Sequence, residues 1–274
     1  MPSAKNITAA SDLIFRSRPL VIGHRGFCAI APENTLPSFA LAMKAGADLI
    51  ELDYRHSKDG VPMVIHDATL DRTTNARKLW KRKHIKVANK TATEIQMLDS
   101  GNWFDAKFAG AKIPRLTEAL DFICGNGAVA LIERKSGDAK TLAKLLREQN
   151  WICPTVVISF DWKFLRELHE LEPDLILGAL GPPARLSNGK KPTHLRRGLS
   201  ARLNDIAKTG ASVVVWNRHI SKRAIRLAHQ RKLKIWIYTI SHPPITRRLL
   251  NCGVDGIITN DAGLFADKER ISRL

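Results

Sequence analysis

The sequence contains no apolar run that approaches the roughly 18 residues needed by a membrane-spanning helix. Its N-terminal stretch, MPSAKNITAASDLIFRSRPL, lacks the hydrophobic core and the small-residue cleavage site of a secretory signal. Cysteine is scarce, and the four cysteines lie far apart without a Cys-x-x-Cys pair: Cys28, Cys124, Cys153 and Cys252. We therefore expect a cytoplasmic protein whose cysteines are buried thiols, without disulfides or a zinc site.

Acidic residues are also scarce. The chain has 26 acidic and 44 basic residues, which gives a net charge of +18. Between Asp174 and Asp255 the only acidic residue is Asp205, and a second basic run, RKLWKRKHIKVANK, covers residues 77–90. No recognised nucleic-acid-binding motif accompanies this charge, so we expect no specific nucleic-acid partner. Two interpretations remain: a solvated basic surface without a partner, or a surface that contacts anionic membranes or steers anionic substrates.

The length of 274 residues is typical of one (β/α)8 barrel. Short apolar runs alternate with amphipathic segments, which predicts a parallel sheet. We expect eight barrel strands near residues 20–25, 48–54, 128–134, 155–160, 174–179, 212–216, 234–240 and 256–259. Helices are expected near residues 35–46, 117–124, 138–149, 161–170, 199–209, 218–230 and 243–251. Residues 1–19 are expected to form a surface arm or a short helix. The prediction is an α/β protein, a single (β/α)8 TIM barrel over residues 1–274.

One further apolar run, residues 61–66 (VPMVIH), follows the second strand after only the turn Lys58-Asp59-Gly60. This connection is too short for a parallel crossover, which needs about a dozen residues. We therefore predict a β-hairpin over residues 48–66, with His66 returned to the neighbourhood of Asp53. Residues 68–114 are polar, basic and poorly periodic, and we expect an inserted segment there with one short helix near residues 93–98.

Charged side chains end several of the predicted strands. In a (β/α)8 barrel, the carboxyl ends of the strands carry the functional groups. The candidates are His24 and Arg25, Glu51 and Asp53, Glu133 and Lys135, together with His66 at the end of the hairpin. A charged group at the end of a buried strand is costly unless it is paired, metal-bound or needed for chemistry. The alternative to a functional site is a buried ion-pair network that only holds the barrel mouth.

Three of these groups, Glu51, Asp53 and Glu133, are hard oxygen donors. Such a set suits a divalent cation, and it favours Mg²⁺ or Ca²⁺ over zinc. Without a cation, three converging carboxylates would repel one another. The alternative is that they pair only with Arg25 and Lys135.

The two histidines, His24 and His66, suit general acid and base catalysis near neutral pH. A lone histidine after a strand is more often structural, but two beside a predicted metal site favour catalysis. Arg25 offers a planar fork and Lys135 a point charge, and both suit the oxygens of a phosphate.

The ordered set of motifs resembles the glycerophosphodiester phosphodiesterase family. The matching motifs, from about residue 20 to residue 260, are His24-Arg25-Gly26, Pro32-Glu33-Asn34-Thr35, Glu51-x-Asp53, Lys58-Asp59-Gly60, His66-Asp67, Glu133-x-Lys135, Ser159-Phe160 and Gly253-Val254-Asp255-Gly256-Ile257-Ile258-Thr259. The resemblance implies a small cap on the substrate face, formed by residues 68–114. It also implies that the three carboxylates hold the metal and that the two histidines are the acid/base pair.

Two departures from the family pattern concern substrate choice. The family often has Trp-Thr-Val-Asn where this chain has Tyr238-Thr239-Ile240-Ser241, and it often has Asp where this chain has Asn260.

Residues beside these motifs are expected to support the site. Glu33 and Asn34 precede a helix, so they either cap that helix or support the site, with Asn34 in contact with the ligand. Asp67 is placed among the supporting residues. Ser159 also ends a strand, but no nucleophile-elbow motif surrounds it, so we assign it support only.

Aromatic residues near the ends of the late strands, Trp216, Trp236 and Tyr238, fit core packing and pocket lining equally well. We take Trp216 and Tyr238 as substrate-binding candidates.

The sequence therefore predicts a metal-dependent phosphodiesterase that converts glycerophosphodiesters to sn-glycerol 3-phosphate and an alcohol. The first alternative is a lysophospholipase-D-like phosphodiesterase that acts on lysophospholipids. The second is a basic protein that binds nucleic acid or membranes. The attacking oxygen is either the glycerol hydroxyl of the substrate or water, and either histidine could act first as the base.

Overall fold

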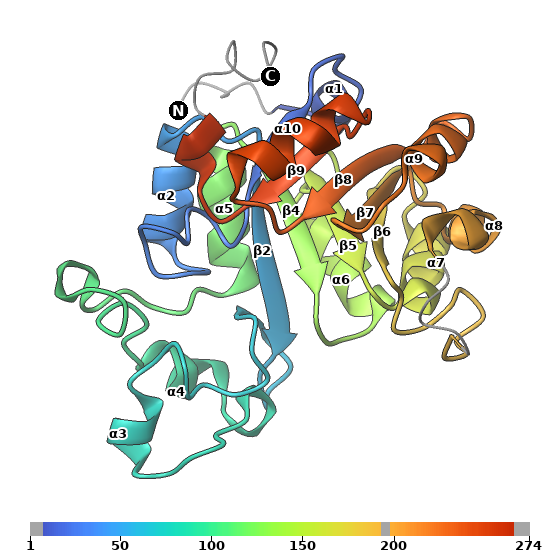
Figure 1. Cartoon of the computed structure of the whole chain (residues 1–274). Coiled ribbons are helices and arrows are strands. Elements are labelled where there is room, and N and C mark those ends of the chain that lie inside the picture. Colours follow the sequence, from blue (N-terminus) through green and yellow to red (C-terminus); the bar gives the residue numbers. More distant parts are fainter. Residues whose placement is uncertain (1–7, 193–197, 266–274) are drawn as a thin grey trace, which may run out of the picture.

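Eight parallel strands form a closed barrel in the computed structural model, which describes residues 8–192 and 198–265 (Figure 1). The barrel strands are β1 (Leu20–Gly23), β2 (Leu49–His56), β4 (Val129–Arg134), β5 (Thr155–Ser159), β6 (Ile176–Gly181), β7 (Val213–Asn217), β8 (Lys234–Tyr238) and β9 (Gly256–Thr259). Each strand pairs with its neighbours in the barrel, and the pairing of β1 with β2 closes the ring. The predicted (β/α)8 barrel and all eight of its strands are confirmed.

Helices follow the strands on the outside of the barrel. They are α2 (Leu36–Lys44), α5 (Leu116–Gly125), α6 (Ala139–Glu148), α7 (Trp162–Leu171), α9 (Lys222–His229) and α10 (Pro243–Asn251), and the 3-10 helix η5 (Ala262–Phe265) follows the last strand. Their apolar faces cover the outward-facing side chains of the strands, such as Ile50, Ile132 and Val214. The burial of these two apolar surfaces against each other stabilises the barrel wall.

The helix expected over residues 199–209 is broken into three short pieces, which corrects that prediction. They are η3 (Leu199–Arg202), α8 (Leu203–Ile206) and η4 (Ala207–Thr209). The last piece packs on α7 and ends at Gly210, which has φ 71°. A Cβ at this position would lie 2.2 Å from Cγ of His169 on α7, so only glycine permits this close approach.

Inside the barrel, alternate residues of the strands meet around the axis. The interior cluster contains Leu20 and Ile22 of β1, Leu49 of β2 and Trp236 of β8. Side chains alternate between the two faces of a strand, so every second residue after these points into the barrel as well. At the carboxyl end of each strand, this alternation decides which side chain reaches the barrel mouth.

A short helix, α1 (Ala10–Ile14), closes the opposite end of the barrel. Its residues Ala10, Leu13 and Ile14 are buried and belong to the interior cluster. The backbone N–H of Ala10 donates to the carbonyl oxygen of Cys153, at 2.9 Å. Of the two alternatives for residues 1–19, the short helix is correct for residues 8–19, and this helix contributes to the core; residues 1–7 lie outside the described part of the chain.

The predicted hairpin is confirmed. Strand β2 continues beyond the barrel, where its last residues pair antiparallel with β3 (Pro62–Val64), and Tyr54 lies opposite Val64. Gly60 in the connecting turn has φ 77°, and its N–H donates to the carbonyl oxygen of Ser57 at 3.1 Å. The hairpin carries the chain from the barrel into the insertion.

The insertion lies below the barrel in Figure 1, beyond the end of β2. It contains α3 (Ala76–Trp80), η1 (Val87–Asn89), α4 (Ala92–Gln96) and η2 (Ala106–Phe108), where only one short helix was expected. A hydrophobic cluster of its own, which includes Leu70, Ile85, Ile95 and Ile113, holds these short elements together. Short helices are marginal in isolation, so this shared core stabilises them.

The four cysteines are free, but only Cys124 is fully buried, and Cys153 is exposed. The expectation of four buried thiols is therefore wrong in part. Within residues 8–192 and 198–265, none of the helices has the length and apolar character required to cross a bilayer.

We expect Ile14→Ala to lower the free energy of unfolding by about 2–5 kcal/mol, because it removes a buried side chain from the closed end of the barrel. The neighbouring Phe15 is 61% exposed, so Phe15→Ala is the matched control, with an expected effect within about 0.5 kcal/mol. Urea unfolding of both variants measures the difference. Equal losses would show that α1 does not contribute to the core.

Candidate active site

The side chains at the barrel mouth continue the inward phase of the strands. Every second residue of a strand points inward. The inward series of β1 continues from positions 20 and 22 to His24, that of β2 from position 49 to Glu51 and Asp53, and that of β4 from positions 129 and 131 to Glu133. All eight barrel strands are parallel, so these ends meet at the same side of the barrel. The structure therefore brings the sequence-predicted residues together by strand periodicity.

Glu51, Asp53 and Glu133 form a cluster in which one oxygen of each carboxylate lies within 4.8 Å of the others. Asp53 lies directly opposite Glu133 in the register of β2 and β4. Burial and the charges of Asp53 and Glu133 raise the pKa of Glu51 well above its usual value. Burial and the charge of Asp53 also raise the pKa of Glu133 to about 7. When all three carboxylates are ionised, the cluster therefore carries negative charge that its buried surroundings disfavour.

Asp53 is the carboxylate with the most polar neighbours. Asn34 Nδ2 donates to Asp53 Oδ2 at 2.9 Å, and Asn34 Oδ1 accepts from the backbone N–H of Asp53 at 3.2 Å. Arg25 Nε lies 3.3 Å from Oδ2 and Lys135 Nζ lies 3.1 Å from Oδ1. Burial alone would raise the pKa of Asp53, but the charges of Lys135, Arg25 and His66 outweigh it and lower the pKa. Asp53 is thus held ionised in a fixed orientation.

The turn after β1 adopts an unusual backbone. Arg25 has φ 52° and Gly26 has φ 85°, and a Cβ at Gly26 would lie 2.4 Å from Oγ of Ser38. The backbone N–H of Arg25 donates to Glu51 Oε2 at 2.7 Å. Non-glycine residues with positive φ are uncommon and cluster at functional sites. This turn fixes both His24 and Arg25 over the carboxylates.

His24 is held by the residue that follows the last strand. Its Nδ1 lies 2.6 Å from Oδ1 of Asn260. With the amide oxygen on this side, Nδ1 carries the proton and Nε2 keeps its lone pair. Burial and the positive charge of Arg25 lower the pKa of His24 to about 4. The imidazole is therefore neutral at physiological pH.

His66 has an ionised partner instead. Its Nδ1 lies 2.8 Å from Oδ1 of Asp67. Arg72, from the insertion, donates through Nε to Asp67 Oδ2 at 2.8 Å and through NH1 to Glu33 Oε2 at 2.7 Å. Glu33 in turn accepts from Arg25 NH1 at 2.7 Å. Hydrogen bonds and the charge of Arg72 thus lower the pKa of Asp67, and an unbroken chain of ion pairs joins His66 to Arg25.

The alternative role for Glu33 and Asn34, a plain helix cap, does not hold. Thr35 is the N-terminal cap of α2, and its Oγ1 accepts from the N–H of Ser38 at 3.5 Å. Glu33 and Asn34 direct their side chains to charged groups of the site.

A cavity of about 230 Å³ lies at the barrel mouth. Its lining residues are His24, Arg25, Glu51, His66, Glu133, Lys135, Ile158, Phe160, Leu180, Tyr238, Thr239 and Ile258. One wall is therefore charged and the other is apolar. Tyr238 lies in the apolar wall, where its ring meets the ring of Phe160 edge to face, with centroids 6.0 Å apart.

Six predicted candidates do not line this cavity. Four of them bind residues that do: Glu33, Asn34, Asp53 and Asp67. Trp216 and Ser159, in contrast, are placed apart from the charged groups. Trp216 has the opposite phase to Val213 and Val215, so it points outward and is buried between β7 and the helices. Ser159 is buried as well, and its Oγ accepts from the backbone N–H of Asp161 at 3.1 Å. Ser159 therefore supports the turn after β5, and among residues 8–192 and 198–265 no histidine, lysine or carboxylate side chain forms a hydrogen bond with its Oγ.

Three residues of the site were not among the sequence-predicted candidates: Arg72, Phe160, which was named only within a family motif, and Asn260, which was named only as a departure from the family pattern. Phe160 and Asn260 continue the inward phase of β5 and β9, so strand periodicity could have identified them. Arg72 belongs to a segment without regular periodicity, and its role depends on how the insertion folds back on the barrel. No local pattern indicates that contact.

Comparison with known proteins identifies the family of this chain. Residues 24–264 match the model of the glycerophosphoryl diester phosphodiesterase family. A glycerophosphodiester phosphodiesterase of Caldanaerobacter subterraneus is 33% identical over 250 residues, which cover 89% of this chain and 95% of that protein. This chain belongs to the glycerophosphodiester phosphodiesterase family. It is therefore a phosphoric diester hydrolase by family.

Solved structures share the fold. The crystal structure of a glycerophosphodiester phosphodiesterase from Agrobacterium tumefaciens has a TM-score of 0.74 and 30% identity, and the match covers 90% of this chain and 99% of that one. A phosphodiesterase from Oleispira antarctica, solved in complex with the product sn-glycerol-3-phosphate, has a TM-score of 0.76 and 24% identity, with 94% of this chain and 98% of that one covered.

The family implies a divalent cation, and the carboxylate cluster fits one. Its three ligand atoms are hard oxygens close enough to share a single ion. Asp53 Oδ1 is buried, accepts no hydrogen bond, and has an ion pair with Lys135 Nζ, while burial and neighbouring carboxylates raise the pKa of Glu51 and of Glu133. A cation among Glu51, Asp53 and Glu133 would satisfy all three groups.

We expect Arg72→Ala to lower kcat/KM for glycerophosphodiester hydrolysis by about 10- to 100-fold, with a lower kcat. The loss follows because Asp67 and Glu33 both lose a charged hydrogen-bond partner, so His66 and Arg25 are less well oriented. Arg72→Lys should recover little, since a lysine cannot bridge two carboxylates with a planar fork. Arg77→Ala, an exposed arginine of α3, is the control. Wild-type kcat and pH profile in Arg72→Ala would contradict this role.

Proposed function

We propose that this enzyme hydrolyses small glycerophosphodiesters to sn-glycerol 3-phosphate and a free alcohol in a reaction that requires a divalent cation. The observation that carries the proposal is a single cavity lined by both histidines, two members of the carboxylate cluster, Arg25 and Lys135. The product bound by the Oleispira antarctica enzyme, which has the same fold, supports the choice of substrate class.

The size of the cavity favours the small substrate over a lysophospholipid. Its volume of about 230 Å³ lies below the roughly 300–1,000 Å³ of typical ligand pockets. A glycerophosphodiester with a small alcohol fits this space, whereas an acyl chain would extend beyond it. The lysophospholipase-D-like activity is therefore the weaker alternative.

Arg25 and Lys135 are proposed to bind the phosphate. Both side chains are largely buried, which strengthens their interaction with an anion. Glu51, Asp53 and Glu133 would hold Mg²⁺ or Ca²⁺, which supplies positive charge to the phosphate oxygens as charge develops in the transition state. Lys135 contacts both Asp53 and Glu133 and lines the cavity, so its charge lies beside the proposed cation ligands.

The two histidines are proposed to act as base and acid, and their partners differ in charge. His24 is paired with the neutral Asn260 and has a lowered pKa, so it is suited to take a proton from the attacking oxygen through Nε2. Burial lowers the pKa of His66 as well, while the charge of Asp53 and the hydrogen bond with Asp67 oppose that shift. The ionised Asp67 stabilises the imidazolium form of His66, from which the ring would give a proton to the leaving alcohol.

The apolar wall of Phe160 and Tyr238 is proposed to receive the alcohol. The hydroxyl of Tyr238 donates to the carbonyl oxygen of Gly181 at 2.9 Å, which fixes the ring. An aromatic surface suits the quaternary ammonium of choline, and ethanolamine is an alternative cationic alcohol.

Two features of the proposal stay open to experiment. The attacking oxygen is the glycerol hydroxyl, which would give a cyclic phosphate, or water. The cytoplasmic location stays a prediction.

The decisive experiment compares glycerophosphocholine with lysophosphatidylcholine as substrates, with and without a chelator. We expect turnover of glycerophosphocholine, its loss in excess chelator, and recovery on addition of Mg²⁺ or Ca²⁺. Preferential turnover of the lysophospholipid would reverse the choice of substrate. Full activity in chelator would exclude a catalytic cation.

Glu51→Gln and Asp53→Asn should each abolish this activity and weaken cation binding, because an amide replaces a charged ligand. Isothermal titration with the cation separates a binding defect from a folding defect. Glu167→Gln, on the exposed side of α7, is the matched control. A variant of the cluster that binds the cation as the wild type does would remove that residue from the ligand set.

His24→Ala and His66→Ala should each lower kcat by roughly 10²–10⁴-fold while the fold is retained. The control is His229→Ala, since His229 pairs with Asp255 at the opposite end of β9. The rate is measured from pH 5 to pH 9. A histidine whose replacement leaves the wild-type rate over that range would have a structural role only.

A further inference from the structure

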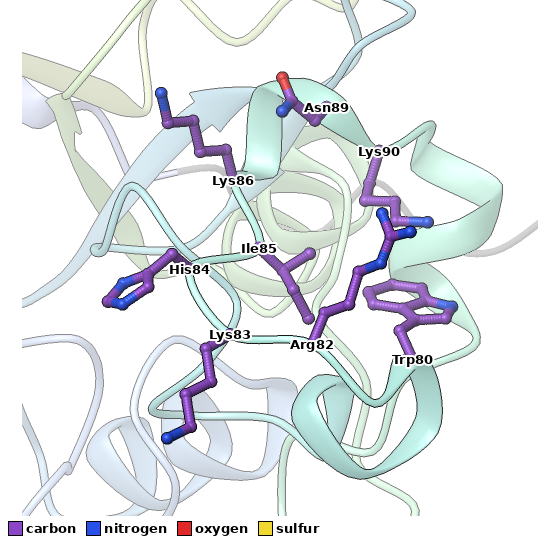
Figure 2. Close-up of a pocket in the computed structure, with 8 residues that line it drawn as sticks. All are labelled: Trp80, Arg82, Lys83, His84, Ile85, Lys86, Asn89 and Lys90. Atoms are coloured by element: carbon purple, nitrogen blue, oxygen red, sulfur yellow. The ribbon is translucent and has the colours of Figure 1, made fainter.

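A second cavity lies in the insertion and shares no lining residue with the cavity at the barrel mouth. Its volume is about 530 Å³, and one continuous stretch of the chain lines it (Figure 2). The lining residues are Trp80, Arg82, Lys83, His84, Ile85, Lys86, Asn89 and Lys90. Four of these residues are basic and none is acidic, so the cavity selects for negative charge.

Most of this positive charge has no partner in the protein. Lys90 Nζ lies 2.7 Å from Glu94 and 4.0 Å from the centre of the Trp80 ring. Arg82, Lys83 and Lys86 are exposed, and within the described part of the chain they form no ion pair. Cations grouped in this way repel one another until an anion binds among them.

The backbone that carries these cations is held in place. Lys81 has φ 50° and His84 has φ 56°, a conformation that non-glycine residues seldom adopt. The carboxylate of Asp71 accepts from the backbone N–H groups of His84 and Ile85, both at 2.9 Å. Ile85 is buried in the core of the insertion. A fixed loop loses less conformational entropy on binding than a flexible tail does.

Apolar side chains accompany the charge. Trp80 is half-buried at the cavity, and its neighbour Leu79 is 49% exposed on the same short helix, α3. Tryptophan is enriched at membrane interfaces, where its ring lies at the level of the headgroups. Cations beside exposed apolar residues favour an anionic bilayer over a soluble phosphate, which needs no apolar contact.

We propose that residues 77–90 dock on the surface of an anionic phospholipid bilayer through Arg82, Lys83 and Lys86, whose charged ends spread over this face of the insertion (Figure 2). Trp80 and Leu79 enter the interfacial layer beside these cations. This contact is separate from hydrolysis, since none of these residues lines the cavity at the barrel mouth. The net charge of the chain predicts contact with an anionic membrane only in general terms. The proposal assigns that contact to one cavity.

The test is co-sedimentation with vesicles of phosphatidylcholine alone or mixed with phosphatidylserine, at low and high salt. The wild type should bind the mixed vesicles, and salt should release it. Near an anionic surface each cation contributes about fivefold to binding, so Arg82→Glu with Lys83→Glu should weaken it at least about 25-fold. Lys83→Gln with Lys86→Gln is a milder second variant, for which we expect a loss of at least about 10-fold.

The matched control is Lys222→Glu with Arg223→Glu on α9, which changes the net charge by the same amount at another basic surface. We expect its vesicle binding to fall less than about threefold. Equal losses in the control and in the first variant would assign binding to the overall charge and overturn the proposal. So would equal binding of the wild type to neutral and mixed vesicles.

Two further measurements distinguish the other occupants of the cavity. Inorganic phosphate at millimolar concentration should not displace the protein from the mixed vesicles, and complete displacement would assign the cavity to a small soluble anion. Hydrolysis of glycerophosphocholine in solution should be unchanged in all the variants, which shows that they fold. Vesicle binding that persists in a folded first variant would also overturn the proposal.

Discussion

The structure of the site depends on the burial of three carboxylates at one end of a barrel. Like charges in a low-dielectric environment repel strongly, so Glu51, Asp53 and Glu133 cannot lie within 4.8 Å of one another without compensation. Arg25 and Lys135 supply part of it, and both are centred on Asp53. Burial and the neighbouring carboxylates nevertheless raise the pKa of Glu51 and of Glu133. The divalent cation that the family implies would supply further positive charge to this cluster.

Strand periodicity made much of this arrangement predictable. Glu51 and Asp53 stand two residues apart, so they had to share a face, and the short turn at Gly60 required a hairpin that returned His66. Comparison with the inward-facing residues of the same strand would have predicted that Trp216 points outside the barrel. It would also have predicted that Phe160 and Asn260 point inside. The error over Trp216 came from its position near a strand end, which was considered without its phase.

The contacts that the sequence could not predict are those made across the insertion. Arg72 reaches Glu33, which lies 39 residues earlier in the chain, and no periodic pattern connects the two. Residues 68–114 form short helices whose positions depend on a small shared core and not on their own propensity. The break of the segment 199–209 has a similar origin, because close packing against His169 at Gly210 decides where it ends. Local sequence rules lose their force where tertiary contacts select the backbone.

Two consecutive residues of the insertion, Asp71 and Arg72, contact its basic loop and the barrel mouth, respectively. Asp71 holds the basic loop through the N–H groups of His84 and Ile85, and Arg72 binds Asp67 and Glu33 at the barrel mouth. Asp71 and Arg72 are neighbours in a bend of the chain, and their side chains contact different groups, so one short stretch serves both sides. The basic loop and the active site keep separate binding residues, since the two cavities share no lining residue.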